Sequence, residues 1–237
     1  MIAPDAQKVR AWDWPTRAFH WALVFCIASA WASYNFAGKL GDPTLKWHRW
    51  NGYAILVLVV FRLIWGIVGS STSRFSSFVR SPLATLSYAM DSLRGRDRPF
   101  LGHNPLGSWM ILVLLLAVST QAILGLYTLE HNELVAGPLK RTISDGWTET
   151  LSKLHIKGYN VILALVGVHV LANSLHALLK KDPLIRAMVT GQKPAMAYED
   201  ASEARIVSRV SLRAGGVLLL AITIVFGGIT LLGGRIL

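Results

Sequence analysis

The sequence predicts an all-α integral membrane protein, in which a four-helix transmembrane bundle is followed by a fifth, C-terminal transmembrane helix. Hydrophobic residues make up 53% of the 237 residues and charged residues only 16%. The apolar residues gather in five runs, each near the roughly 20 residues that a helix needs to cross a bilayer. The net charge is +11, and most of the basic residues lie in the connections between the apolar runs. The apolar runs leave too little chain for a soluble, basic fold that binds nucleic acid.

The expected helices follow the apolar runs, because lipid offers no partner to backbone groups outside a helix. We expect residues 1–194 to form the four-helix domain and residues 195–237 to form an inner linker and the fifth helix. Asn104 is the expected N-cap of the third helix, and Pro105 its first residue. The transmembrane helices should cover about residues 18–37, 48–69, 106–129, 153–179 and 210–232.

The connection between the second and third runs carries a shorter periodic segment. Over residues 81–95, apolar side chains recur at helical spacing after Pro82, which predicts an amphipathic helix lying in the inner interface. The apolar positions are Leu83, Leu86, Met90 and Leu93.

The orientation follows from the basic residues. Lys and Arg concentrate in the connections that lie inside when the N-terminus is inside, so we expect a cytoplasmic N-terminus and a periplasmic C-terminus. No secretory signal is visible in the first residues. The single cysteine, Cys26, excludes an internal disulfide, a CxxCH attachment site and a thiolate-rich metal centre.

Four histidines fall within or at the edge of the apolar runs, where a functional role is the first hypothesis. His20 opens the first run and His48 the second, while His155 and His169 lie on one face of the fourth, about 21 Å apart along its axis. The expected topology sorts them by depth. His20 pairs with His169 near the inner surface, and His48 pairs with His155 near the outer surface.

Two such pairs suit haem, since a six-coordinate haem iron takes one axial nitrogen on each side of the ring. Without a CxxCH motif the haem would be noncovalent and therefore b-type. A zinc or di-iron carboxylate site is disfavoured because the apolar runs contain almost no Asp or Glu. A single membrane histidine often serves only an interhelical hydrogen bond, but four at matched depths favour the two haems.

Other residues are candidates to contact the haems. Arg62 follows His48 by about four turns, which puts its guanidinium at the inner level beside a propionate; the alternative is that it snorkels to headgroups. His176, two turns beyond His169, is a hydrogen-bonding neighbour or a substitute ligand. The weaker candidates are the propionate partners Arg17, Arg49, Lys153 and Lys157, and Gly52 and Gly158, which would let a flat ring approach the backbone.

Five stretches of the chain resemble the bacterial cytochrome b561 and nickel-iron hydrogenase cytochrome b subunit superfamily. The resemblance spans roughly residues 8–194 and implies a four-helix core with two b haems, whose ligands carry over onto His20, His48, His155 and His169. The matching stretches are WPTRAFHW at 14–21, WHRWNGY at 47–53, FRLIWG at 61–66, GHNPLG at 102–107 and the helix that carries His155 and His169.

The expected function is that of a membrane-bound dihaem b-type cytochrome in the respiratory chain of a bacterial inner membrane. It would transfer electrons across the bilayer between the quinone pool and a c-type cytochrome, another periplasmic haem protein or a hydrogenase. No catalytic residue is assigned, and a homo-oligomer is left open. Proton-exchanging groups for quinone would be Glu130 and His131 outside, or His103 and His176 inside.

Two other functions stay open at this point. One is a stand-alone, quinone-linked oxidase of a small reductant such as superoxide. The other is a non-redox transporter or membrane anchor, in which the histidines would form a proton path.

Overall fold

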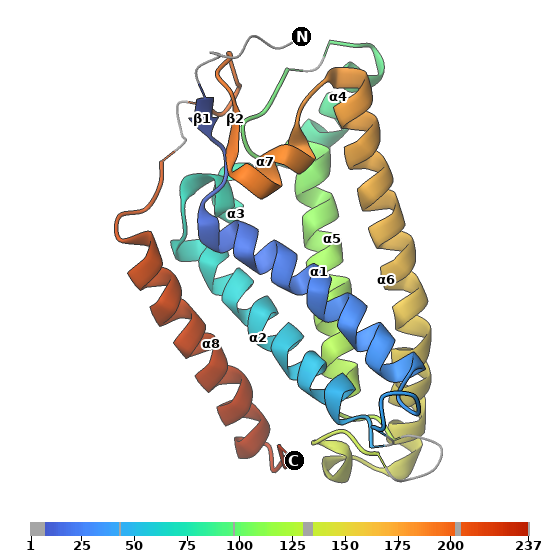
Figure 1. The fold of residues 1–237 in the computed structure, drawn as a ribbon. Coiled ribbons are helices and arrows are strands. Elements are labelled where there is room, and N and C mark those ends of the chain that lie inside the picture. Colours follow the sequence, from blue (N-terminus) through green and yellow to red (C-terminus); the bar gives the residue numbers. More distant parts are fainter. Residues whose placement is uncertain (1–7, 43, 97, 130–134, 202–204, 237) are drawn as a thin grey trace. The chain divides into compact units, whose positions relative to one another are not determined.

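The computed structural model describes residues 8–42, 44–96, 98–129, 135–201 and 205–236. These residues are mainly helical (Figure 1), and the predicted fold class, a helical membrane bundle, is confirmed. The long helices are α1 (Trp14–Asn35), α2 (Lys46–Val68), α5 (Pro105–Gly125), α6 (Asp145–Lys180) and α8 (Val210–Leu231). Shorter ones are α3 (Phe75–Phe78), α4 (Pro82–Leu93) and α7 (Leu184–Thr190), with 3-10 turns at Ser71–Ser73 and Lys140–Thr142.

Four of the long helices, α2, α5, α6 and α8, are long and apolar enough to cross a membrane. The remaining one, α1, occupies the first predicted span but does not reach the same hydropathy. Its polar residues explain the difference, because His20, Ser33 and Asn35 lie among its apolar side chains. The chain is a multi-pass membrane protein.

Helix ends differ from the expected ones where polar residues continue a helix beyond an apolar run. The largest difference is in α6, which begins at Asp145 rather than near residue 153. An acidic residue in the first turn favours a helix N-terminus, and Lys153 and Glu149 form an ion pair one turn apart. At α5 the predicted start is confirmed, since Asn104 Oδ1 accepts from the backbone N–H of Gly107 at 2.8 Å.

The chain divides into two compact units, each of which collects residues from distant parts of the sequence. The first unit comprises Met1–Ala18, Leu63–Val113 and Gly167–Ala214, and the second unit comprises Phe19–Arg62, Leu114–Val166 and Gly215–Leu237. Residues on both sides of position 194 contribute to the first unit. The expected domain boundary at that position stays a prediction.

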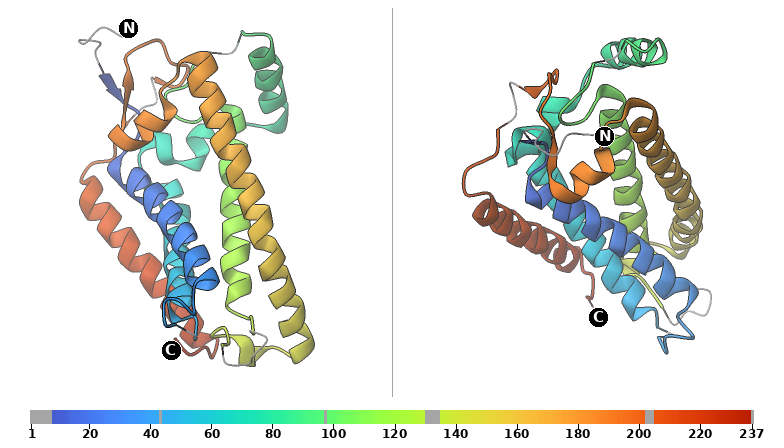
Figure 2. Two further views of the ribbon diagram at one scale, coloured as in Figure 1. Left: turned by 45° about the vertical axis from the view of Figure 1, so that its right-hand side comes forward. Right: turned by 45° about the horizontal axis from the view of Figure 1, so that its top comes forward.

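The first unit contains the small sheet. Strand β1 (Lys8–Arg10) pairs antiparallel with β2 (Gln192–Pro194), with Val9 opposite Lys193 (Figure 2). Helix α7 leads into β2 through Gly191, whose φ of +82° is a left-handed conformation that favours glycine. Beside this sheet is an apolar cluster of Ala11, Trp12, Leu101, Ala187 and Tyr198.

A buried carboxylate fixes the start of α1 in the same unit. Asp13 accepts from the N–H of Thr16 at 3.0 Å and from the Trp65 indole Nε1 at 3.1 Å. The first bond caps the helix. The second ties its start to α2.

The second unit is held by contacts among the long helices. Ile55 and Val59 of α2, Val118 of α5 and Ile162 of α6 form a buried cluster. Side chains of α1, including Cys26, pack against it. Helix α8 joins through Phe226, whose ring lies 5.7 Å from that of Tyr53 on α2. The helices therefore enclose a common interior in this unit.

Candidate functional site

The second unit contains a cavity of about 370 Å³ between α1, α2, α5 and α6. Binding pockets for small molecules and cofactors are typically about 300–1,000 Å³. The walls are mostly apolar, and both His48 and His155 line them. The cavity thus offers ligand-sized space with two imidazoles at its boundary.

The two imidazoles lie close together, with ring centroids 6.2 Å apart and ring planes at 89°. Nδ1 of His48 lies 2.9 Å from the carbonyl of Ala30, and Nδ1 of His155 lies 2.9 Å from the carbonyl of Gln121. A carbonyl can only accept a hydrogen bond, so each Nδ1 carries the proton. This tautomer leaves the lone pair on Nε2, which is the form in which a neutral histidine binds a metal.

Gln121 and His155 hold each other through two hydrogen bonds. The side-chain Nε2 of Gln121 donates to the carbonyl of His155 at 2.8 Å, and the Gln121 carbonyl accepts from His155 as described above. These bonds fix α5 against α6 at the level of the imidazole. Gln121 was not among the predicted site residues, although a polar amide inside an apolar run was a usable signal.

Two glycines shape the space around this pair. A Cβ on Gly125 would lie 3.0 Å from Cε1 of His155, so the glycine makes room for the imidazole. Gly52 lines the cavity, and a Cβ there would meet nothing within 4 Å, so this position adds open volume. Gly158 has a different part, since its Cβ would collide with Oε1 of Gln121.

The basic residues near His48 and His155 that were predicted to hold a propionate differ in whether they line the cavity. Arg49 lines the cavity together with Gly52. Lys157 is exposed on α6 and is not part of the lining. Lys153 is also exposed and forms an ion pair with Glu149. Among the predicted propionate partners at this level, only Arg49 faces the cavity.

The other two predicted ligands belong to different units, and each is described by itself. His20, in the second unit, is half-buried and stands edge-on to Trp21, with ring centroids 4.9 Å apart. His169, in the first unit, is half-buried, and the Asn173 amide lies 3.4 Å from both of its ring nitrogens. The Asn173 amide also donates to the His169 carbonyl at 2.7 Å.

The two inner arginine candidates also differ. Arg62 on α2 is only 2% exposed, so its charge is buried in the second unit. Arg17 is engaged with the chain itself in the first unit, because its Nη1 donates to the carbonyl of Val189 at 2.5 Å. Arg17 therefore binds the last turn of α7 in this structure.

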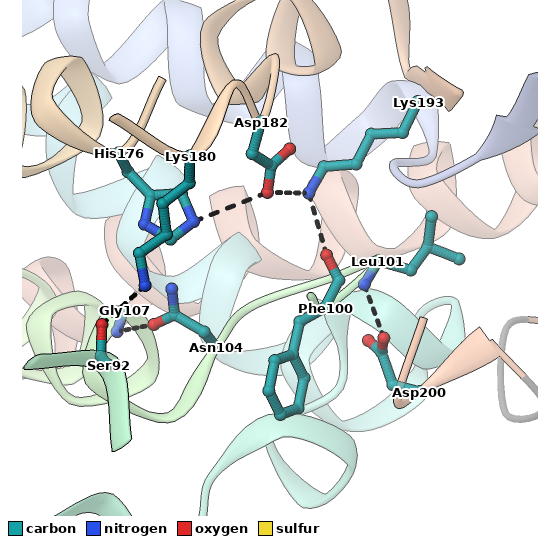
Figure 3. A network of polar contacts seen from close by, with 10 residues as sticks. All are labelled: Ser92, Phe100, Leu101, Asn104, Gly107, His176, Lys180, Asp182, Lys193 and Asp200. Atoms are coloured by element: carbon teal, nitrogen blue, oxygen red, sulfur yellow. Dashed lines mark hydrogen bonds and ion pairs between the residues drawn. The ribbon is translucent and has the colours of Figure 1, made fainter. Parts of the chain in front are cut away.

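His176 belongs to a polar network that sequence reasoning did not find (Figure 3). Its Nε2 lies 3.7 Å from Oδ2 of Asp182, and the same oxygen accepts from the Lys193 ammonium at 3.0 Å. Lys193 also donates to the carbonyl of Phe100 at 2.9 Å, and its side chain is fully buried. Burial lowers the pKa of Lys193, and the Asp182 carboxylate opposes that shift.

A second carboxylate completes the network. Asp200 accepts from the N–H of Leu101 at 2.6 Å and of Gly102 at 2.9 Å. Burial, together with Asp182 and Asp200, raises the pKa of Tyr198 to about 12. The network therefore joins the segment before α5 to the segment after α6.

The remaining histidine candidates have separate surroundings. His103 lies between two aromatic rings, 4.5 Å from Trp12 and 4.6 Å from Phe78 between centroids. Glu130 and His131 lie outside the described residues.

A model of the prokaryotic cytochrome b561 family matches residues 11–191 of the chain, which include every predicted histidine ligand. The chain belongs to this family. Members are membrane proteins that bind b-type haem and transfer electrons. The resemblance found in the sequence motifs is thereby confirmed.

Two curated relatives illustrate the range of the cytochrome b561 family. A probable superoxide oxidase CybB of Yersinia pestis is 26% identical over 178 residues, which cover 71% of this chain and 90% of the relative. A probable Ni/Fe-hydrogenase B-type cytochrome subunit of Rhizobium leguminosarum bv. viciae is 22% identical over 227 residues, which cover 84% of this chain and 94% of the relative.

The cavity of the second unit fits the b-type haem of this cytochrome family. It supplies two imidazoles whose Nε2 lone pairs are available, apolar walls, and open volume at Gly52. Arg49 adds a cationic group that suits a propionate. This agreement of donor type, tautomer and space makes the cavity the candidate haem site.

Proposed function

We propose that this cytochrome b561 family member binds two b-type haems noncovalently and carries electrons across the bacterial inner membrane. His48 and His155 would ligate the outer haem, and His20 and His169 the inner one. The quinone pool would be one redox partner, and a c-type cytochrome, another periplasmic haem protein or a hydrogenase the other.

The observation that carries the proposal is the arrangement of His48 and His155. Each Nδ1–H is bound by a carbonyl of a neighbouring helix, which directs the two Nε2 atoms to act as ligands. A pair of histidine ligands leaves no open iron position for oxygen, and this favours electron transfer. When bound, haem iron would supply the one-electron redox chemistry.

The charged residues would serve the cofactor rather than the reaction. Arg49 at the outer cavity and Arg62 in the buried part of α2 would each hold a propionate, since a buried guanidinium is stabilised by a carboxylate partner. Each charge-assisted hydrogen bond of this kind would also fix the orientation of the haem that it contacts.

The assignment of His20 and His169 to the inner haem is based on their expected depth in the membrane and on their positions in α1 and α6. His169 shares the unbroken helix α6 with His155, and the expected topology brings the start of α1, with His20, to the same membrane surface. Asn173 would orient the His169 imidazole. His176 would act near this haem as a polar neighbour rather than as a ligand, because its Nε2 faces Asp182.

Orientation and partner follow from charge and kinship. The excess of basic residues in alternate connections supports a cytoplasmic N-terminus and a periplasmic C-terminus. The kinship with a hydrogenase cytochrome subunit supports a partner that is itself a redox protein. Lys46, Arg49 and Lys153 at the outer helix ends would attract an acidic docking surface.

A second candidate function is quinone-linked oxidation of superoxide, which is favoured by the likeness to a probable superoxide oxidase. The same outer basic residues would attract this small anion. Stopped-flow mixing separates the two functions. Rapid haem reduction by superoxide without any protein partner supports the oxidase, and reduction only by a redox protein supports the relay.

The proposal is tested by the visible spectrum and haem content of the purified protein. Two b-type haems per chain with low-spin, six-coordinate spectra are expected. His155→Ala should remove one haem while leaving the other, and His103→Gln, as a matched histidine change, should leave both. A colourless protein would favour a transporter or anchor, and retention of both haems by His155→Ala would disprove the assigned pairing.

A further inference from the structure

Helix α4 carries its large apolar side chains on an outward face that the described residues of the first unit leave largely exposed. The exposed fractions are 80% for Leu83, 61% for Leu86, 43% for Met90 and 83% for Leu93. At 100° per residue these four side chains fall within a narrow sector of the helix. Such a large exposed apolar stripe marks a binding surface.

The opposite face of α4 is the one that contacts the protein. Thr85 is buried, the ring of Tyr88 lies 5.7 Å from that of Phe100, and Ser92 Oγ accepts from the Lys180 ammonium at 2.7 Å. The polar side of the helix thus faces the first unit. The apolar side is turned away from it, which is the reverse of the pattern of a helix at the surface of a soluble protein.

Two contacts fix the depth of α4 relative to the membrane. Lys180 is the last residue of α6, and its bond to Ser92 holds the C-terminal turn of α4 at the end of that span. Near the start of α5, Trp109 Nε1 donates to the carbonyl of Arg80, just before α4, at 3.2 Å. Both helices are candidate membrane spans. Consecutive spans run in opposite directions, so the start of α5 and the end of α6 share one membrane surface. The two contacts therefore hold α4 at that surface.

Arginines flank α4 at this level. Arg80 precedes the helix, Arg94 caps its C-terminus and Arg96 follows, and all three side chains are exposed. Within the described part of the chain none of them forms an ion pair, whereas the nearby Arg98 is paired with Glu199 at 3.0 Å. Cations beside an apolar face that lies in the interface are complementary to anionic phospholipid headgroups.

We propose that α4 and its flanking arginines form a binding site for anionic phospholipid of the inner leaflet. The leucines would enter the acyl-chain region, and Arg80, Arg94 and Arg96 would bind headgroup phosphates. This interaction is independent of haem, and it anchors the first unit through the contacts to α5 and α6.

Lipid selectivity tests the charge part of the site. The full-length protein is equilibrated in detergent with equal amounts of phosphatidylglycerol and phosphatidylcholine, and the retained lipid is measured by mass spectrometry. A basic residue near a membrane contributes about five-fold to binding of anionic lipid, so Arg94→Gln/Arg96→Gln should lower the ratio of phosphatidylglycerol to phosphatidylcholine by up to about 30-fold.

The matched control for this experiment is Arg98→Gln/Arg186→Gln, which removes two exposed arginines that do not flank α4. It should change the ratio much less, and salt at about 1 M should remove the preference in the unaltered protein. Equal retention of both lipids by the unaltered protein, or an equal loss in the control variant, would overturn the proposal. Helical circular dichroism verifies that each variant is folded.

Insertion is tested with a nitroxide label in a Cys26→Ser background, at Leu86→Cys and at Ala84→Cys, an exposed position of α4 outside the apolar stripe. In vesicles containing phosphatidylglycerol, the label at position 86 should collide with oxygen and be shielded from an aqueous nickel complex. The label at position 84 should show the reverse. A position 86 label that is open to the nickel complex, or shielded from both agents by a protein contact, would contradict lipid insertion.

Discussion

The second unit arranges its polar atoms around an open cavity, whereas the first unit uses its polar atoms to bind one another. In the second unit, His48 and His155 each donate a hydrogen bond from Nδ1 to a backbone carbonyl, and both residues line the cavity with Nε2 available as a ligand. In the first unit, Lys193 and Asp182 are buried as a pair. A cofactor site needs unused lone pairs beside unfilled space, and the arrangement of His48 and His155 offers both.

The largest expected effect comes from breaking the buried ion pair of the first unit. Lys193→Ala leaves Asp182 without its ammonium partner, which should lower the free energy of unfolding by about 3–5 kcal/mol. Thermal unfolding followed by circular dichroism measures the change. The haem that we propose for the cavity of the second unit should still bind below the melting temperature.

Two further variants sharpen the comparison for Lys193. Lys153→Ala removes an exposed ion pair of the second unit and should cost at most about 1 kcal/mol. Lys193→Met combined with Asp182→Asn should recover part of the lost stability, because no charge then lacks a partner. A double variant no more stable than Lys193→Ala would show that the pair is not the cause.

A smaller effect is expected from filling the space beside His155. Gly125→Ala introduces a Cβ 3.0 Å from the imidazole, and overpacking of this kind costs about 1–3 kcal/mol. The electron paramagnetic resonance signal of the proposed outer haem should shift as the His155 imidazole turns. Gly167→Ala on α6, where a Cβ meets nothing within 4 Å, should leave the signal unchanged. Identical spectra for both variants would exclude a constraint from Gly125.

The capping carboxylate of α1 should have a comparable but more local effect. Asp13→Asn weakens the bonds to Thr16 and Trp65 and should cost about 1–2 kcal/mol. Hydrogen exchange should rise at the start of α1 and leave the cavity helices protected. The matched control is Asp145→Asn in the first turn of α6, where the carboxylate is exposed. A rise in hydrogen exchange at the start of α6 as large as that at the start of α1 would argue against a special role for Asp13.

The smallest effect is confined to alkaline pH. The folded pKa of Tyr198 is about 12, above its usual value of 10, because of burial and the nearby Asp182 and Asp200. A raised folded pKa gives stability that is complete below pH 10 and is lost as pH rises from about 10 to about 12. Tyr198→Phe should remove the phenolate absorbance that develops near pH 12. A phenol lost near pH 10 instead would contradict the burial effect.

The sequence predicted the helical bundle because a membrane imposes a simple constraint on composition and length. The pairing of the histidines was predicted from their expected depths in the membrane, which follow from helix rise and topology. The structure places the His48 and His155 rings next to each other. Haem ligation by these two residues is our proposal. The reduced hydropathy of α1 follows from its polar residues and could have been read from the sequence.

Other parts of the site depend on contacts that periodicity does not reveal. The bond from Gln121 to His155, the room that Gly125 gives the imidazole, and the buried position of Lys193 each join residues far apart in the chain. Arg17 resembled a propionate partner in the sequence, but its bond to the Val189 carbonyl depends on where α7 ends. Such pairings need the folded chain.

The anchors of both cavity histidines are main-chain carbonyls, at Ala30 and Gln121. Side-chain substitutions at these two positions leave the carbonyls in place, so they cannot delete the acceptors that set the imidazole tautomers. The orientation of the two imidazoles is then set by the helix backbone and not by neighbouring side chains. Substitutions of the surrounding side chains can then change the redox potential or the partner, while both imidazoles keep their orientation toward the cavity.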